Sequence, residues 1–84
     1  MAVYRIEIDR GAAKALAGFD KPISLVAAID ALAHNPRPPG AKKLVGGAGE
    51  WCIRVGDYRI VYEVHGGRLV VLVVRVAHRR EVYR

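Results

Sequence analysis

The sequence has very few of the side chains that act as nucleophiles or bind metals. It contains one cysteine, Cys52, one serine, Ser24, and no threonine. A single cysteine excludes an internal disulfide and a zinc site built on several thiolates. The shortage of hydroxyl groups leaves little room for an enzyme with a serine or threonine nucleophile. The lack of disulfides is typical of a reducing compartment, so we expect a cytoplasmic protein.

Long hydrophobic runs are also absent. No stretch approaches the roughly 18 apolar residues that a membrane-spanning helix needs, and the longest run, Leu69 to Val74, has the length of a strand. The N-terminal stretch lacks the apolar segment of a secretory signal. With 84 residues, 52% of them hydrophobic, the chain fits one small folded domain, which we expect to span 1–84.

Charge is distributed unevenly along the chain. Residues 1–36 carry four basic and four acidic side chains, whereas residues 37–84 carry ten basic and four acidic ones, so the second part holds the whole net charge of +6. Seven of these ten basic residues are arginines in the last 34 positions. Arginine presents a planar fork of donors that suits phosphate oxygens. The distribution indicates a surface for a polyanion, and a solvated basic face is the alternative.

The first half of the sequence predicts a strand over 3–8 followed by two helices. Asp9 is suited to cap a helix with Ala12, Leu16 and Phe19 on its apolar face. A second helix is predicted to begin with Asp20 as cap and Pro22 in the first turn. Its apolar stripe is Leu25, Ile29 and Leu32, and Asn35-Pro36 should end it. Because both helices are rich in alanine, we expect them to pack closely as an αα-hairpin and to cover a sheet.

The second half predicts three strands, at 51–55, 58–64 and 69–76. Gly56-Asp57 and Gly66-Gly67 are typical of tight hairpin turns between them. Together with the opening strand, these elements give an α+β domain of order β-α-α-β-β-β. Two N-terminal helices should pack on a small, mainly antiparallel sheet of four strands.

A two-residue loop at Gly56-Asp57 fixes which residues face each other. It places Arg54 directly opposite Arg59 on one face. The other face should be the core face, made of Trp51, Ile53, Val55, Tyr58, Ile60, Tyr62 and Val64. Like charges directly opposed destabilise a sheet, so the arginine pair indicates a bound anion. Neutralisation by a nearby carboxylate, that of Glu50, Glu63 or Asp57, is the alternative.

The same alternation extends to the last strand. It predicts Val70, Leu72 and Val74 on the arginine face and Leu69, Val71 and Val73 on the core face. A strand that is apolar on both sides should be central or covered, and the arginines would surround an apolar floor. By this count Arg75 falls on the core side, and the pattern gives no reason for a charged residue there.

The last residues carry polar groups suited to phosphodiester chemistry. Arg79 and Arg80 can bind a phosphate, Tyr83 can stack on a base or exchange a proton, and the imidazole of His78 can transfer a proton. A solvated terminus, a tyrosine packed on the core and a surface histidine are the alternatives. The sequence has no cluster of ligands at metal-binding spacing, so we expect no metal site.

Two segments together carry a specific pattern. They are 51–64, Trp-Cys-Ile-Arg-Val-Gly-Asp-Tyr-Arg-Ile-Val-Tyr-Glu-Val, and 76–83, Val-Ala-His-Arg-Arg-Glu-Val-Tyr. With Pro36-Arg37-Pro38 and the segment 42–46, they resemble the RelE branch of the RelE/ParE toxin superfamily, and the resemblance covers essentially the whole chain. It implies a RelE-like toxin of a type II toxin–antitoxin system that cuts messenger RNA in the ribosomal A site.

The chemistry implied by the resemblance is attack of a ribose 2′-OH on the adjacent phosphate, leaving a 2′,3′-cyclic phosphate and a 5′-OH, with no metal or cofactor. Arg54 matches a catalytic basic residue, and Arg59 matches the arginine that holds the scissile phosphate. Arg79 matches the residue that stabilises or protonates the leaving 5′ oxygen, and Tyr83 the one that orients or deprotonates the 2′-OH. Further RNA or phosphate contacts are expected from Arg37, Lys42, Lys43, His78 and Arg80.

The resemblance also implies the partners, which are a cognate RelB-like antitoxin, the ribosome and messenger RNA, without a membrane. Cys52 departs from the pattern, because some RelE members have a second catalytic lysine there. A ParE-like toxin that binds DNA gyrase without nuclease chemistry is the alternative on the same fold. ParE members generally lack the arginine–tyrosine set that this sequence keeps. A third reading is a RelE fold that only binds its antitoxin and represses an operon.

Overall fold

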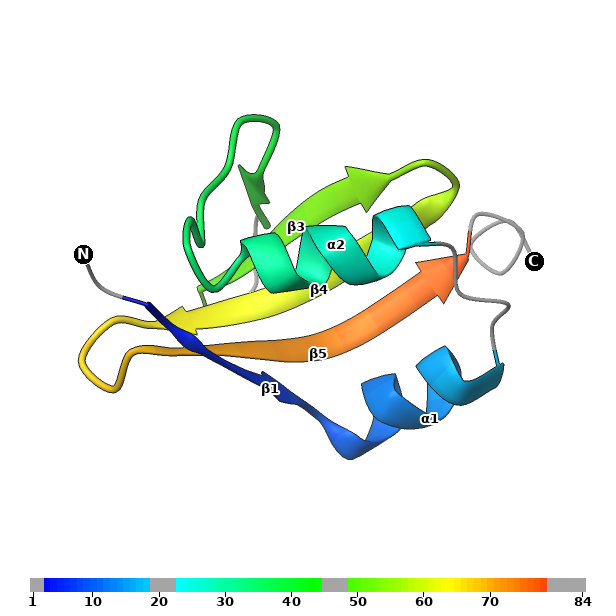
Figure 1. Ribbon diagram of the computed structural model, residues 1–84, viewed down its shortest axis with the longest axis horizontal. Helices are drawn as coiled ribbons and strands as arrows, with labels where there is room; N and C mark the ends of the chain where they lie inside the picture. Colours follow the sequence, from blue (N-terminus) through cyan, green and yellow to red (C-terminus); the bar gives the residue numbers. More distant parts are fainter. Residues whose placement is uncertain (1–2, 19–22, 45–48, 79–84) are drawn as a thin grey trace.

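A computed structural model describes residues 3–18, 23–44 and 49–78, and within these ranges two helices cover one face of a five-stranded sheet (Figure 1). The elements are, in chain order, β1 (Arg5–Ile8), α1 (Arg10–Gly18), α2 (Ile23–Ala31), β2 (Lys42–Lys43), β3 (Glu50–Val55), β4 (Tyr58–His65) and β5 (Val70–His78). The strand order is β1-β5-β4-β3-β2. The predicted α+β fold is thereby confirmed. Neither helix is long and apolar enough to cross a membrane, as far as these ranges show.

The sheet is mainly antiparallel, as predicted, but it has five strands where the sequence predicted four. The additional strand is β2, whose two residues pair antiparallel with β3 at one edge. Two lysines are too short a segment to produce a hydrophobic alternation, so the pattern could not reveal them. At the other edge β1 runs parallel to β5, which makes β5 central between β1 and β4.

The first helix begins where the sequence predicted. The Gly11 backbone N–H donates a hydrogen bond of 3.2 Å to Asp9 Oδ2, so the Asp9 side chain caps α1. Ala12 and Leu16 are buried, which confirms the predicted apolar face over the described part of this helix. The predictions for Phe19, Asp20 and Pro22 fall outside the described residues.

The predicted stripe of Leu25, Ile29 and Leu32 is buried, with Leu25 and Ile29 on α2 and Leu32 directly after it. The helix ends at Ala31, ahead of Asn35-Pro36. The Leu32 N–H donates a hydrogen bond of 3.1 Å to the Ile29 carbonyl, three residues earlier, which is the pattern of a 3₁₀ turn and not of an α-helix. α1 packs on β5 and α2 on β3, so each helix rests on its own part of the sheet (Figure 1). The helices therefore cover the sheet as predicted, but over their described residues α1 and α2 do not pack closely on each other as the αα-hairpin suggested by their alanine content would.

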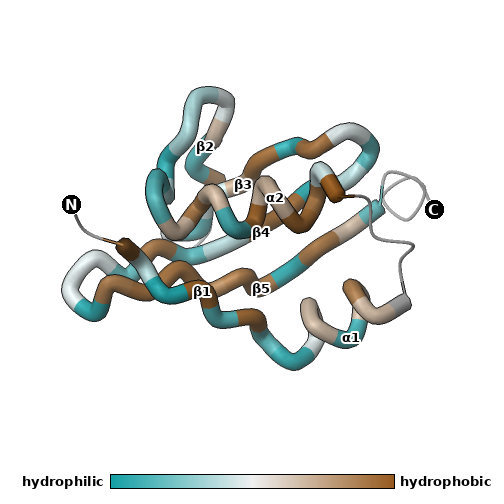
Figure 2. Tube along the Cα trace, viewed as in Figure 1, coloured by the Kyte–Doolittle hydropathy of each residue, from teal (hydrophilic) through white to brown (hydrophobic). Residues whose placement is uncertain are grey.

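The core lies between the helices and the face of the sheet that they cover. Figure 2 shows hydrophobic residues along the central strands, alternating with hydrophilic ones. Tyr62 is fully buried there, and its Oη donates a hydrogen bond of 2.6 Å to the Pro36 carbonyl. This bond ties the segment after α2 to the middle of β4. Burial raises the pKa of Tyr62 to about 12, which keeps the hydroxyl group protonated and able to donate.

The register of β3 against β4 is the predicted one. Val55 pairs with Tyr58, so Gly56 and Asp57 form a two-residue loop, and Arg54 stands directly opposite Arg59. Gly56 has a φ of 59°, the positive value that a type II′ turn requires at this position and that glycine adopts readily.

The register of β5 against β4 corrects the prediction for the last strand. Val61 pairs with Arg75, but the next pair is Tyr62 with Val73, so Val74 is an extra residue at a β-bulge. Alternation therefore does not continue through the strand as the sequence suggested. Each residue after the bulge therefore points to the face opposite to the one that strict alternation predicts. Arg75 lies on the same face as Val61 and Arg59.

The start of the last strand also differs from the prediction. A hairpin turn containing Gly66-Gly67 joins β4 to β5 as predicted, but the connection runs from Gly66 to Leu69, and β5 begins one residue later than the sequence suggested. Leu69 belongs to this turn, with a φ of 53°, and the residue is 42% exposed. The prediction that Leu69 lies on the core face is therefore wrong, whereas Val71 and Val73 are fully buried there as predicted.

Candidate functional site

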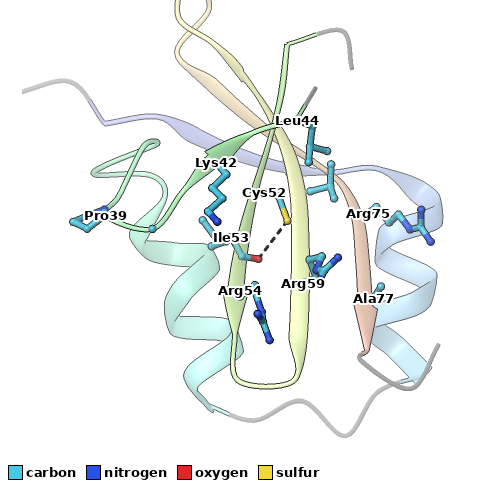
Figure 3. A pocket seen from close by; sticks show the side chains of 11 residues that line it. Pro39, Lys42, Leu44, Cys52, Ile53, Arg54, Arg59, Arg75 and Ala77 are labelled. Atoms are coloured by element: carbon cyan, nitrogen blue, oxygen red, sulfur yellow. Dashed lines mark hydrogen bonds between the residues drawn. The ribbon is translucent and has the colours of Figure 1, made fainter. Parts of the chain in front are cut away.

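The face of the sheet that the helices leave open carries a pocket of about 610 Å³ (Figure 3). Its lining comes from β2 to β5 and from the segments beside β2. The lining residues are Pro39, Gly40, Lys42, Leu44, Cys52, Ile53, Arg54, Arg59, Val61, Arg75 and Ala77. Four of them are basic, and no acidic residue is among them. The pocket is therefore an electropositive site with apolar surface between its charges.

Strand pairing arranges these side chains in two rows across the sheet. One row is formed by directly paired residues on four strands, Lys42, Cys52, Val61 and Arg75. The neighbouring row contains Arg54, Arg59 and Ala77. Paired residues point to the same face of a sheet, so both rows face the pocket. The first row has a cation at each end and uncharged residues at its centre, while the second places two guanidinium groups side by side.

The arginine pair has no carboxylate partner within the described ranges. The ion pairs found there are Arg5 with Glu7 at 3.0 Å and His65 with Glu63 at 2.8 Å. Glu63 is one of the three carboxylates that the sequence offered as neutralising partners, and it binds His65 instead. Arg54 and Arg59 are both exposed on the open face, so their guanidinium groups are available to an anion.

Cys52 lies in the pocket floor between Lys42 and Val61. Burial raises the pKa of the Cys52 thiol, and the nearby charges of Arg59 and Arg54 only partly oppose this effect. The thiol therefore stays neutral near pH 7, and the centre of the floor carries no charge of its own. Among the residues that the structure describes, no three His, Cys, Asp or Glu side chains gather closely enough to hold a metal ion.

The sequence-predicted site residues fall into three groups. Arg54, Arg59 and Lys42 come together in the pocket. Lys43 pairs with Trp51, whose ring the Arg37 guanidinium covers at 5.4 Å, so Lys43 and Arg37 lie toward the other face of β3.

His78 also belongs to the covered face of the sheet. It pairs with Tyr58, and the two rings meet edge to face with centroids 5.0 Å apart. The remaining predicted residues, Arg79, Arg80 and Tyr83, lie outside the described residues.

Arg75 is the pocket residue that sequence reasoning missed. Strict alternation along the last strand put it on the core side, and the bulge at Val74 turns it to the pocket. The sequence did hold a signal of this. An unpaired arginine among buried valines would be costly, so a charged residue at a nominal core position indicates that the alternation slips before it.

The architecture is similar to that of toxins whose structures have been solved. A chain of the archaeal RelE–RelB complex from Pyrococcus horikoshii matches with a TM-score of 0.76 and 27% identity, covering 92% of this chain and 96% of that one. The isolated E. coli RelE toxin matches with a TM-score of 0.77 and 28% identity, covering 95% and 90%. A chain of the RelBE2 toxin–antitoxin complex from Mycobacterium tuberculosis matches with a TM-score of 0.75 and 26% identity, covering 93% and 100%. No curated protein sequence matches this chain significantly.

The fold and these likenesses define a toxin of the type II toxin–antitoxin class with a RelE-like structure. A family model described as the ParE toxin of type II toxin–antitoxin system, parDE, matches residues 6–83. The chain belongs to this family, and with it to the RelE/ParE toxin superfamily that the sequence resembled.

Proposed function

We propose that this toxin is a ribosome-dependent endoribonuclease that cleaves messenger RNA in the ribosomal A site, in the cytoplasm. The observation that carries the proposal is the pair Arg54 and Arg59, which stand directly opposite each other in an open pocket without a described carboxylate partner. Two like charges held side by side destabilise a sheet. A bound phosphate relieves that repulsion, because its negatively charged oxygens accept hydrogen bonds from both guanidinium groups.

The reaction needs what this pocket offers. The ribose 2′ oxygen forms a bond to phosphorus, the bond from phosphorus to the 5′ oxygen breaks, and negative charge gathers on the phosphoryl oxygens in between. Fixed guanidinium groups stabilise that charge without reorganising during the step. Arg59 holds the scissile phosphate, and Arg54 supplies a second positive charge beside it. The neutral floor at Cys52 and Val61 excludes part of the water, which strengthens both interactions.

Two proton transfers complete the cleavage, and we assign them by the sequence resemblance. A base removes the proton of the 2′-OH, and an acid protonates the departing 5′ oxygen. Tyr83 takes the first role or orients the 2′-OH, and Arg79 stabilises or protonates the departing oxygen. Tyrosine is a weak base because its ordinary pKa is near 10, so orientation of the 2′-OH is a role that it can take without losing its proton. No metal ion is required by this scheme.

The partner that we propose is a RelB-like antitoxin. Similar toxins have been solved as RelE–RelB and RelBE complexes. This chain carries a net charge of +6, concentrated in its second part, so an acidic or amphipathic antitoxin segment would be attracted to it electrostatically. The ribosome and messenger RNA are the other proposed partners, and both present phosphates to the same charges.

A second candidate function is inhibition of DNA gyrase by binding alone. The observation that favours it is the family model, whose description names a ParE toxin. Gyrase binding would need no phosphate site and would leave the opposed arginines on the open face unexplained. We therefore rank it below the nuclease.

Induction of the toxin in growing cells separates the two candidates. We expect new messenger RNA 5′ ends within codons of translated genes and no gyrase-linked DNA breaks. Arg59→Ala should abolish both the new ends and the growth arrest while the variant still binds its antitoxin. Arg68→Ala is the matched control, because Arg68 is an exposed arginine in the β4–β5 turn and does not line the pocket. Gyrase-linked breaks without messenger RNA cleavage, or full toxicity of Arg59→Ala, would overturn the nuclease proposal.

A further inference from the structure

Arg75 is a third arginine on the pocket, and neither the resemblance nor the cleavage scheme gives it a task. It is exposed, it lines the pocket from β5, and neither ion pair of the described residues includes it. It reaches this position only through the bulge at Val74. A bulge that turns a charged side chain toward a site commonly serves that site.

The position of Arg75 relative to the arginine pair is set by the sheet. It lies one strand beyond Arg59 and one row away, because Arg59 pairs with Ala77 and Arg75 stands two residues earlier on β5. Strand spacing and rise per residue put the two Cα atoms roughly 8 Å apart. Figure 3 shows the Arg75 guanidinium apart from those of Arg54 and Arg59, so the three do not converge on one point.

Lys42 occupies the opposite end of the row that contains Arg75. The two residues stand on β2 and β5, three strand spacings apart, which is roughly 14 Å between Cα atoms. Between them the row is uncharged, with Cys52 and Val61. Cations at the two ends, with the arginine pair beside the centre, fit an extended chain of phosphates better than a single one.

We propose that Arg75 binds the RNA phosphate next to the one held by Arg54 and Arg59, so that the RNA backbone crosses the sheet from β4 to β5. This inference rests on the proposed nuclease function. In this arrangement the RNA backbone runs across the strands. Lys42 on β2 and Arg75 on β5 then lie on opposite sides of the arginine pair. The arrangement also gives Arg75 a positioning role, since a second fixed phosphate orients the ribose whose 2′-OH attacks.

The test is binding of a short RNA with 2′-O-methyl groups throughout, which cannot be cleaved, measured by fluorescence anisotropy over a range of KCl concentrations. A single-stranded nucleic acid contributes about 0.7 to the slope of log affinity against log salt for each neutralised phosphate. We expect Arg75→Gln to weaken binding and to lower the slope by about that amount. Arg75→Lys keeps the charge and should retain the slope. Arg68→Gln is the matched control and should bind like the unchanged protein.

Replacement of single phosphates by neutral methylphosphonates locates the contact. The unchanged toxin should lose affinity at two adjacent positions, and Arg75→Gln should become insensitive at one of them only. Arg75→Gln with unchanged affinity and slope would overturn the inference alone if Arg59→Gln still weakens binding. If Arg59→Gln also binds like the unchanged toxin, both the inference and the proposed phosphate site are overturned. An equal loss in Arg68→Gln would show a general charge effect and would overturn the inference as well.

Discussion

The two faces of the sheet differ sharply, although the same strands build both. The face under the helices buries Ile53, Ile60 and Tyr62, and it holds most of the described core. The open face carries Arg54 and Arg59 on the same two strands, at alternate positions. Because successive strand residues point to opposite sides, neighbours in sequence have separate tasks.

The difference shows how a chain of 84 residues can hold both a core and a charged site. A small domain has little buried surface to spare, and this one keeps cations that repel each other on the open face of its sheet. The repulsion is tolerated because the opposite face is well packed. Stability should therefore respond to changes under the helices, and activity to changes in the pocket.

The largest expected effect is on activity, in Arg54→Gln. Removal of one preorganised donor from a site that stabilises developing charge costs about 10²–10³-fold in rate, so we expect cleavage to fall by that factor. The free energy of unfolding, measured in urea, should rise by about 0.5 kcal/mol in the same variant, because the repulsion between Arg54 and Arg59 is relieved. The gain should shrink as salt is added. A variant that loses activity and stability together would break the separation of the two faces.

Adjacent residues of β4 give the matching test of stability. Ile60 is fully buried under the helices, and Ile60→Ala should lower the free energy of unfolding by about 3 kcal/mol. Val61 is half-buried on the pocket side, and Val61→Ala should cost only about 1 kcal/mol. Urea titrations of both variants measure the contrast. Equal losses would mean that the open face is packed as tightly as the covered one.

Tyr62→Phe probes the bond between the core and the segment after α2. Loss of the hydrogen bond to the Pro36 carbonyl should cost about 1 kcal/mol. The raised pKa of Tyr62, about 12, adds a pH signature. Burial favours the neutral phenol in the folded state, so this contribution is complete below pH 10 and is lost as the pH rises toward about 12. Unfolding free energies should fall more steeply across that window in the unchanged toxin than in Tyr62→Phe.

Cys52→Lys tests whether the neutral centre of the open face matters, because it adds a charge to the pocket floor. Since the pKa of the Cys52 thiol is raised by burial, the unchanged floor is neutral near pH 7. A lysine there should strengthen binding of uncleavable RNA and raise the salt slope by about 0.7. Cys52→Ser, which adds no charge, is the control and should leave the slope unchanged. A slope that does not rise in Cys52→Lys would place the RNA backbone away from the floor.

Much of the molecule could be predicted from local sequence. Asp9 caps α1, Leu25 and Ile29 bury the face of α2, and Gly56-Asp57 sets the register that opposes Arg54 to Arg59. Each of these depends on residues close together in the chain, where periodicity, capping and turn chemistry act. The central part of the candidate site was accessible for the same reason, because one hairpin holds both arginines.

Tertiary structure decided what depends on distant partners. The parallel pairing of β1 with β5, the short edge strand β2, the bulge at Val74 and the separation of the two helices all arise from contacts between remote segments. Alternation along one strand cannot report a slip that only its neighbour defines. Local patterns in the chain were enough to predict that Arg54 and Arg59 share a face of the sheet. The fold decided that Arg75 joins them, because an extra residue in a central strand moves every later side chain to the other side.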